Sequence, residues 1–381
     1  MLRVAIVADL LEEGWPSMDL VAEMLADELR RGHADSIRAD IVRPAMRRRF
    51  SRVSGRAGRN TDRLVNRFLD YPRHVQSLRD QYDLFHLADH SYSQLVHHLP
   101  AHRTVVTCHD LDTFRSVLDS AHERRSALFR AMTGRILTGF RRAARVTCDS
   151  ATVRAEILAH RLVAPEHLVV IPNGVHPSCS PAPNAPADAE AERLLGRARA
   201  DVPEILHVGS TIARKRIDVL LRVFAAIRHE VPSAHLVRVG GELTAEQDLL
   251  AREIGVANAI ISLPFLSRDV LAAIYRRAAL VLQPSSAEGF GLPVVEAMAC
   301  GTPVVASDIA VLREVGGEVA AYCPVADIAA WSATVTALLT ERSARPARWA
   351  TRRAAGVTHA AHFTWALYVR KTVDVYRDVA G

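Results

Sequence analysis

Residues 279–306 read ALVLQPSSAEGFGLPVVEAMACGTPVVA, and this stretch decides the fold. The apolar run at 279–283 predicts a buried strand, and the run at 303–306 predicts the next one. Between them, Gly289 and Gly291 predict a turn whose backbone approaches a ligand closely, and Pro293 suits the first turn of a helix. Free amide groups at such a helix start can bind a phosphate or a sugar oxygen. The stretch therefore predicts a strand–loop–helix unit with a ligand site at the loop.

The same alternation of short apolar runs and amphipathic segments extends over most of the chain. Helix patterns lie at 18–31, 61–80, 150–160, 216–229 and 267–276. Further strand patterns lie at 2–8, 83–87, 104–108, 144–148, 168–171, 205–208 and 235–239. Most are unbroken Val-, Ile- and Leu-rich runs, as expected for parallel strands buried on both faces. The alternation predicts an α/β fold with doubly wound, Rossmann-like domains.

The length of 381 residues suggests about two domains. One Pro- and Ala-rich stretch, PSCSPAPNAPADAE at 177–190, interrupts the pattern and predicts a linker without a long helix. We expect an N-terminal domain at 1–176, a linker at 177–200 and a C-terminal domain at 201–361, facing a central cleft. A last helix at about 362–381 is expected to pack back on the N-terminal domain.

Composition excludes several classes of protein. The five cysteines are scattered and form no CxxC pair, which argues against a zinc module and for reduced thiols in the cytoplasm. No apolar stretch approaches the roughly 20 residues of a membrane-spanning helix. The net charge of +6 fits an anionic partner. No aromatic-interleaved basic strand supports nucleic acid as that partner.

The stretch at 285–306 resembles the donor-site signature of GT-B glycosyltransferases of family 4, in which seven residues separate two glutamates. The segments ILHVGS at 205–210, RKRIDVLL at 214–221, VRVGGE at 237–242 and LSRDVL at 266–271 also resemble that family at closely matching spacing. The resemblance implies a GT-B fold and a retaining, metal-independent glycosyltransferase (a hexosyltransferase). Such an enzyme moves a hexose-type sugar from a nucleotide-sugar donor to a hydroxyl of a glycan, lipid-linked or small-molecule acceptor. The donor is a substrate, and the resemblance implies neither a cofactor nor a metal.

The resemblance also implies a role for each residue of the motif. Glu288 contacts the donor sugar and Glu296 binds the nucleotide ribose. The loop amides that hold sugar and phosphate belong to Gly289, Phe290, Gly291 and Leu292. Two glutamates near the positive end of a helix have a purely structural explanation as well, but the surrounding glycines and proline favour a site.

The family also uses a basic pair to neutralise the diphosphate leaving group. The lysine of that pair maps onto Lys215, one of only two lysines in the chain. A compact ammonium charge suits phosphate. Ser210 stands in the donor site where many members carry an arginine, so we expect Arg214 to supply the second charge.

In the first half, the strand pattern 104–108 ends in His109 and Asp110. This resembles the family's strand ending in His-Asp, whose histidine hydrogen-bonds the donor sugar; a histidine bonded to a backbone carbonyl is the alternative. Asp110 and Asp112 resemble a metal-binding Asp-x-Asp, but GT-B enzymes generally need none, and we expect no metal site. Gly14 is the only glycine available for the family's diphosphate-facing loop after the first strand.

Residues 43–63 carry eight arginines against the single acid Asp62: Arg43, Arg47, Arg48, Arg49, Arg52, Arg56, Arg59 and Arg63. A mobile solvated loop explains them as well as an anionic surface does, either a membrane leaflet or a charged acceptor. The expected location is cytoplasmic, with peripheral contact to the inner face of the membrane as a hypothesis. The alternative functions are another GT-B enzyme, such as a nucleotide-sugar epimerase or a phosphorylase, and a non-catalytic anion-binding protein.

Overall fold

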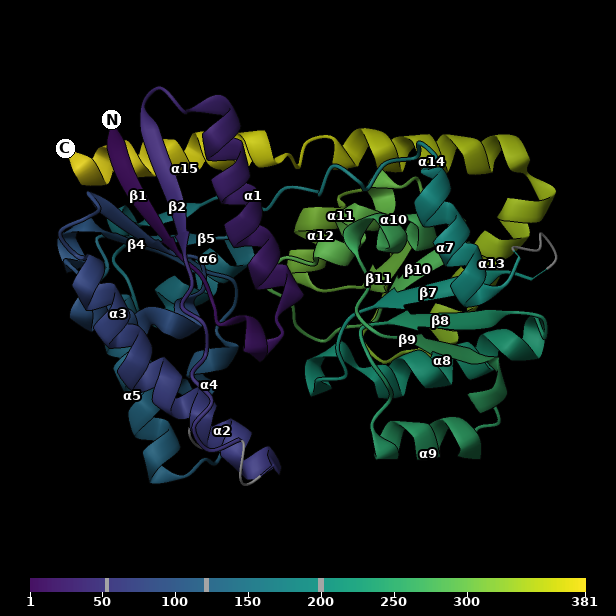
Figure 1. The fold of residues 1–381 in the computed structure, drawn as a ribbon. Coiled ribbons are helices and arrows are strands. Elements are labelled where there is room, and N and C mark those ends of the chain that lie inside the picture. Colours follow the sequence, from purple (N-terminus) through teal and green to yellow (C-terminus); the bar gives the residue numbers. More distant parts are fainter. Residues whose placement is uncertain (52–54, 120–122, 198–201) are drawn as a thin grey trace. The chain divides into compact units, whose positions relative to one another are not determined.

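A computed structural model describes residues 1–51, 55–119, 123–197 and 202–381 (Figure 1). It consists of two compact units, which are residues 1–174 with 365–381 (unit 1) and residues 175–364 (unit 2). Each unit contains one six-stranded sheet with flanking helices, and the paired strands are parallel. The predicted α/β fold with two Rossmann-like units is confirmed.

In unit 1 the strand order is β2-β1-β3-β4-β5-β6. The strands are β1 (Leu2–Val7), β2 (Ile37–Val42), β3 (Leu84–Leu87), β4 (Thr104–Cys108), β5 (Arg145–Cys148) and β6 (Leu168–Val170). The helices are α1 (Pro16–Gly32), α2 (Gly55–Val65), the π-helical η2 (Asn66–Asp70), α3 (Tyr71–Leu78), α4 (Arg115–Leu118), α5 (Ala127–Arg142), α6 (Ala151–Ala159) and α15 (Trp365–Ala380). The strand order reverses between β1 and β3, so the carboxyl ends of these strands form the usual ligand-binding edge of such a sheet.

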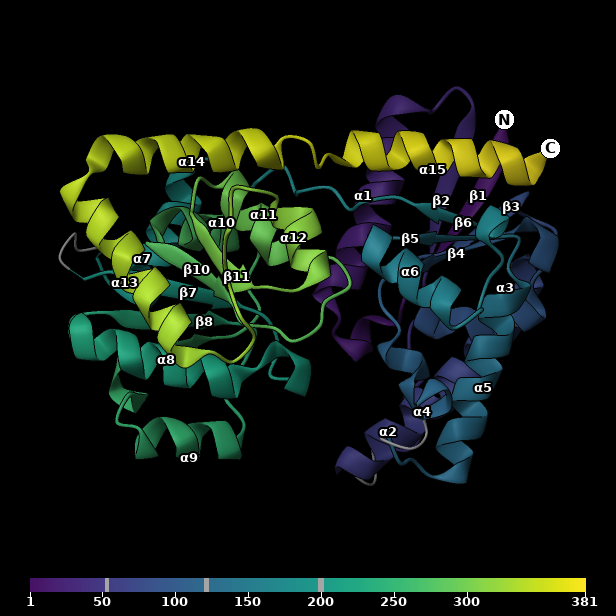
Figure 2. The same cartoon turned by 180° about the vertical axis from the view of Figure 1, so that it is seen from behind.

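The last helix, α15, belongs to unit 1, as Figures 1 and 2 show in yellow. It packs on α1 and contacts β3. The Tyr376 hydroxyl lies 2.6 Å from Nδ1 of the buried His86, and Arg145 forms a 2.6 Å ion pair with Asp378. These contacts join the last residues of the chain to the first sheet.

In unit 2 the strand order is β12-β11-β10-β7-β8-β9. The strands are β7 (Glu204–Val208), β8 (His235–Val239), β9 (Ile260–Leu263), β10 (Leu280–Gln283), β11 (Val304–Ser307) and β12 (Ala321–Cys323). The helices are α7 (Ala185–Leu195), α8 (Ile217–Glu230), α9 (Ala245–Glu253), α10 (Arg268–Arg277), α11 (Leu292–Ala299), α12 (Ala310–Gly316), α13 (Ile328–Ala344) and α14 (Pro346–Ala360). One apolar core lies under α8 and α13 and the other under α10 and α11, on opposite faces of the sheet (Figure 1).

Three strands were not predicted from the sequence: β2, β9 and β12. Each is an edge strand. An edge strand has one neighbour and is incompletely covered, so its residues are less completely buried than those of an interior strand. The strand β2 shows this with exposed Arg38 between buried Ile37 and Ala39.

The linker expected at 177–200 is contradicted at residues 185–195, and its residues 198–200 lie outside the described part of the chain. Residues 185–195 form the 11-residue helix α7, which packs on α10 within unit 2. Asn184 caps this helix by accepting a 3.3 Å bond from the Ala187 amide, and Pro186 lies in the first turn. Proline is tolerated there because the first-turn amides have no intrahelical partner, so the prolines mark a helix start instead of excluding a helix.

The arginine-rich segment at 43–63 also differs from the mobile solvated loop that was one interpretation of its sequence. Residues 55–65 form α2, while Arg52 lies outside the described residues. Arg43 forms a 2.6 Å ion pair with Asp19 on α1, and Arg63 donates a 2.6 Å hydrogen bond to the Glu12 carbonyl. Part of the positive charge is therefore used to hold the segment on unit 1.

Candidate functional site

The strand order of unit 2 reverses between β7 and β10, and the predicted charged residues follow these two strands. The chain leaves β7 at Val208 and enters a short 3-10 turn, Ala213–Lys215, which carries Arg214 and Lys215. The chain leaves β10 at Gln283 and enters the loop that carries Glu288. Ligands of open α/β sheets bind outside the carboxyl ends of strands at such a reversal. The topology therefore brings residues 73 positions apart in the chain to one edge.

Glu288 is the centre of a charge cluster. Its Oε1 accepts a 2.6 Å hydrogen bond from the Lys215 ammonium, and its Oε2 accepts a 2.9 Å bond from the Arg214 guanidinium. The Glu288 side chain is only 5% exposed, while those of Lys215 and Arg214 are 11% and 19% exposed. One carboxylate between two cations leaves a net charge of +1, which suits an anionic ligand.

The electrostatics keep Glu288 ionised. Burial alone would raise its pKa, but the charge of Lys215, then that of Arg214, outweighs burial and lowers the pKa to about 2. A carboxylate in this state accepts hydrogen bonds and cannot supply a proton near neutral pH. The cluster can hold a sugar hydroxyl or orient cations, and it is not a general acid.

Two residues that sequence reasoning did not single out complete the cluster. The Gln283 side-chain amide donates a 2.6 Å bond to Glu288 Oε1, and the Ser285 hydroxyl donates a 2.7 Å bond to the same oxygen. Both residues are fully buried. The available signal was a polar residue at the carboxyl end of an apolar strand, directly before Pro284.

The glycine loop after Glu288 leads into α11. Gly291 caps this helix with φ +96°, a backbone conformation that side chains disfavour, and an added Cβ would lie 2.8 Å from a Leu312 methyl. The Phe290 ring is buried with Val295 and Val315, and its centroid lies 5.7 Å from that of Phe363. The Phe290 side chain is thus a core anchor of the loop, so a donor contact at this position falls to the backbone.

Glu296 lies one helix turn further along and is held separately from Glu288. It is 8% exposed, and its Oε2 accepts a 3.0 Å bond from the Tyr275 hydroxyl of α10. Burial raises the pKa of Glu296, against the hydrogen bond from Tyr275 and the charge of Arg268. Tyr275 is a further partner that the sequence did not reveal.

Ser210 and Gly14 are two further residues that were predicted to bind the donor. Ser210 follows β7 and is half-buried, and among the described residues no hydrogen bond joins it to Glu288 or Lys215. Gly14 belongs to unit 1, where it ends a 3-10 turn, Leu11–Glu13, with φ +70° and is exposed.

His109 lies in unit 1, directly after β4, as predicted. Its Nδ1 lies 2.7 Å from Asp149 Oδ2 and its Nε2 lies 2.8 Å from the Ala88 carbonyl. Burial alone would lower the pKa of His109, but the Asp149 carboxylate outweighs it and raises the pKa to about 10. His109 is therefore an imidazolium with both N–H groups given to protein acceptors, one of them a backbone carbonyl as in the structural alternative. Asp149 follows β5 just as His109 follows β4, which is the signal that could have found it.

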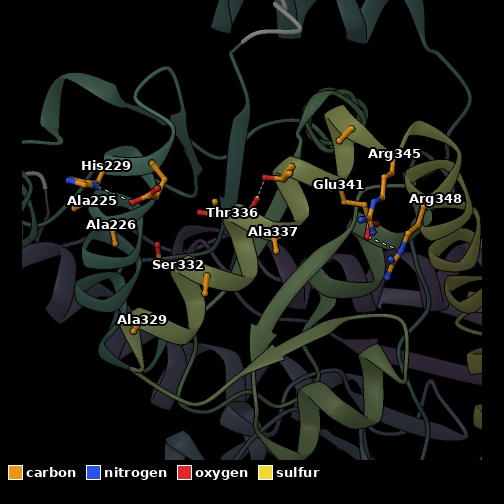
Figure 3. Close-up of a pocket in the computed structure, with 14 residues that line it drawn as sticks. Ala225, Ala226, His229, Ala329, Ser332, Thr336, Ala337, Glu341, Arg345 and Arg348 are labelled. Atoms are coloured by element: carbon orange, nitrogen blue, oxygen red, sulfur yellow. Dashed lines mark hydrogen bonds and ion pairs between the residues drawn. The ribbon is translucent and has the colours of Figure 1, made fainter.

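A wide groove of about 1210 Å³ on unit 2 lies elsewhere, between α8, α13 and α14 (Figure 3). Its walls are mostly alanine, serine and threonine side chains such as Ala225, Ser332 and Thr336 (Figure 3). It lies at the carboxyl-terminal half of α8, whereas the cluster precedes the start of that helix. None of the predicted site residues lines it.

No helix in the described ranges combines the length and apolar character needed to cross a bilayer.

Residues 191–354 match the family model described as glycosyl transferases group 1, and residues 20–178 match the model described as Glycosyltransferase Family 4. Curated relatives include the D-inositol 3-phosphate glycosyltransferases of Salinispora tropica (36% identical, covering 52% of this chain and 43% of the relative) and Thermobispora bispora (34%, covering 61% and 56%). The chain spans about half the length of the curated relatives it matches.

Two solved structures extend the likeness in fold over nearly the whole chain. Sucrose-phosphate synthase from Thermosynechococcus elongatus has a TM-score of 0.77 at 20% identity, covering 100% of this chain and 99% of the other. Anabaena Alr3699/HepE, solved in complex with UDP and glucose, has a TM-score of 0.73 at 17% identity, covering 98% and 99%. With one family model on each unit and a GT-B fold throughout, the chain belongs to the group 1, family 4 glycosyltransferases.

Proposed function

We propose that the protein is a retaining glycosyltransferase that moves a hexose-type sugar from a nucleotide-sugar donor to a hydroxyl group of an acceptor. The observation that carries the proposal is the buried Glu288 carboxylate held between Lys215 and Arg214 at the carboxyl ends of β7 and β10. Relatives named D-inositol 3-phosphate glycosyltransferase, and solved neighbours with UDP or UDP-glucose, support this class of reaction. An epimerase, a phosphorylase or a non-catalytic protein is not favoured.

Lys215 and Arg214 are proposed to stabilise the departing diphosphate. An ammonium carries three N–H donors, of which Glu288 takes one at 2.6 Å. The other donors can turn to phosphate oxygens while Glu288 fixes the side chain in place. Two preorganised cations facing charge that grows during bond cleavage give the electrostatic stabilisation that such a reaction needs.

The donor's remaining groups are assigned to the loop and to α11. Glu288 is proposed to accept a hydrogen bond from a sugar hydroxyl, and the amides of residues 289–292 to hold sugar and phosphate at the helix start. Glu296, positioned by Tyr275, is proposed to accept the ribose hydroxyls. Ser210 is proposed to lie beside the phosphates.

Unit 1 is proposed to bind the acceptor, a glycan, lipid-linked or small molecule, with Gly14 in its first loop. His109 is proposed as the sugar contact of this unit, with its Nε2 N–H turning from the Ala88 carbonyl to a sugar hydroxyl when the donor binds. The acceptor oxygen bonds to the anomeric carbon as the bond to the diphosphate breaks, and the acceptor proton passes to the departing phosphate. Attack from the side of the leaving group retains the anomeric configuration. Neither a metal nor a cofactor takes part in this scheme.

The test is turnover of UDP-, GDP- and ADP-sugars by Lys215→Ala and by Lys371→Ala. Removing a cation that stabilises transition-state charge is expected to cut turnover by about 10² to 10³. Lys371 on α15 is the only other lysine in the chain, so its removal is a matched control expected to stay within about twofold. Equal rates in the two variants would refute the assignment, and no turnover of any donor by the unmodified protein would refute the function.

We further propose a peripheral contact between the segment Arg43–Arg63 and an anionic membrane. The exposed cations Arg47, Arg48 and Arg59 and the exposed Phe50 support it, since cationic and aromatic side chains favour an anionic lipid surface. Flotation with vesicles that contain phosphatidylserine tests it at low salt. Absence of the protein from the floated fraction would remove the proposal.

A further inference from the structure

A cavity of about 460 Å³ lies in unit 1 at the carboxyl ends of β1 and β2. Leu10 follows β1, and Pro44 and Ala45 follow β2; all three line the cavity. The other walls come from the arginine segment, η2 and α3. The volume falls within the range of about 300–1,000 Å³ that is usual for small-molecule sites.

Two buried polar side chains hold the backbone of the arginine segment that forms one wall of this cavity. The buried Asn66 accepts a 2.7 Å bond from the Arg47 amide and donates a 2.8 Å bond to the Arg47 carbonyl. The buried Asp62 carboxylate accepts bonds of 2.9–3.0 Å from the amides of Arg49, Phe50 and Ser51. These bonds outweigh burial and hold the pKa of Asp62 well below its usual range. The segment therefore presents its cations from a fixed backbone.

The cavity carries excess positive charge. Arg47 and Arg73 line it, and Asp70 is the one carboxylate among the lining residues. Asp70 is already held by Arg49, which donates bonds of 2.5 and 2.9 Å to its two oxygens and lowers its pKa. In the described ranges, neither the Arg47 nor the Arg73 guanidinium forms an ion pair. The charges of Arg47 and Arg73 also lower the pKa of Asp70, so this one carboxylate is shared among three guanidinium groups, and the excess positive charge at the cavity suits an oxyanion.

We propose that this cavity binds a phosphate or carboxylate group through Arg47 and Arg73. The inference rests on the proposed function for its biological meaning, because an anionic group held in unit 1 makes the acceptor a phosphorylated or carboxylated molecule. The cavity is larger than a phosphate ion, which leaves room for the part of the acceptor that carries the anion. The phosphate of a lipid headgroup shares this chemistry, so the test separates a soluble source from a membrane source.

The test is calorimetric titration of the full chain with inorganic phosphate at fixed ionic strength set with chloride. Arg47→Gln/Arg73→Gln is expected to raise the Kd at least about tenfold, since both charge-assisted contacts to the oxyanion are lost. Arg130→Gln/Arg141→Gln removes two exposed arginines of α5 and is the matched control, expected within about twofold. Circular dichroism of each variant checks that the fold is kept. Equal loss in both double variants, or no phosphate binding by the unmodified protein, overturns the proposal.

Flotation with phosphatidylcholine vesicles that contain phosphatidic acid distinguishes a lipid phosphate from a soluble anion. Flotation lost only in Arg47→Gln/Arg73→Gln assigns the cavity to a lipid phosphate, and flotation that is unaffected by it assigns the cavity to a soluble acceptor. Hydrolysis of nucleotide sugars by the unmodified protein is measured separately. Phosphate binding without hydrolysis contradicts the proposed function and leaves the cavity assignment standing, whereas hydrolysis without phosphate binding overturns the cavity alone.

Discussion

Replacing Glu288 by glutamine removes the negative charge between Lys215 and Arg214 while keeping the size of the side chain. The pKa of Glu288 falls from the usual 4.5 to about 2 in the folded protein. This difference corresponds to roughly 3 kcal/mol of preference for the ionised carboxylate. Glu288→Gln is therefore expected to lower the free energy of unfolding of unit 2 by about 3 kcal/mol at pH 7.

The sign of the pH dependence follows from the lowered pKa. A carboxylate whose pKa is lower in the folded state stabilises the protein above the unfolded-state pKa, and this stabilisation is lost as the pH falls towards the folded-state value. The difference between unmodified protein and Glu288→Gln is thus expected to be constant from pH 7 to about pH 5.5. It should shrink to roughly half at about pH 3.5.

Urea denaturation followed by hydrogen exchange measures this difference. Peptides from β7 and β10 report on unit 2 alone, so that unfolding of unit 1 does not enter the result. A Glu288→Gln variant as stable as the unmodified protein at pH 7 would refute the reasoning. So would a stability difference that does not change between pH 7 and pH 3.5.

Four further substitutions have expected outcomes. In the unmodified protein, the Asp149 carboxylate raises the pKa of His109 to about 10, so the imidazolium should stay protonated through pH 9 in an NMR titration. Asp149→Asn removes this carboxylate, so His109 of the variant should titrate below pH 7. An unchanged titration would contradict the pairing. The stability from this pair is present below about pH 6.5 and is lost as the pH rises through 10. Gly139→Ala places a Cβ 1.9 Å from the Ser93 carbonyl oxygen, which packs on α5, and should lower Tm strongly. Gly134→Ala in the same helix meets open space and should stabilise the protein by about 0.5–1 kcal/mol. Equal thermal shifts in the two variants would exclude the packing argument. Gly291→Ala should cost about 1–3 kcal/mol at φ +96° and weaken UDP binding in calorimetry; unaltered binding would show that the loop tolerates a side chain.

The interior strands were predictable because burial on both faces requires an unbroken apolar run within a short stretch of chain. The runs at 205–208 and 279–283 both became strands of the unit 2 sheet. The edge strands β2, β9 and β12 were not predicted, since their partly covered residues give a weaker apolar pattern, although the edge strand β6 was predicted from its run at 168–171. The prolines around α7 do not reveal the helix, because proline breaks a helix interior but suits the first turn, where Pro186 lies.

For the candidate site, too, the sequence predicted individual residues but not the contacts between them. The sequence alone pointed to Glu288 and Lys215, because a glycine-bounded glutamate and a rare lysine are visible as local patterns. Their direct bond, and the bond from Gln283 to Glu288, depend on β7 and β10 being neighbours in the sheet although β8 and β9 lie between them in the chain.

The sequence by itself determined the alternation of strands and helices and the identity of the charged residues, because both are properties of short stretches of chain. Only the tertiary structure decided which charges meet and which remain unpaired. It gave the His109 nitrogens to Asp149 and Ala88, and left Arg47 and Arg73 at a cavity. The physical reason is that ionisation and pairing depend on burial and on neighbours distant in the chain, which no local pattern records.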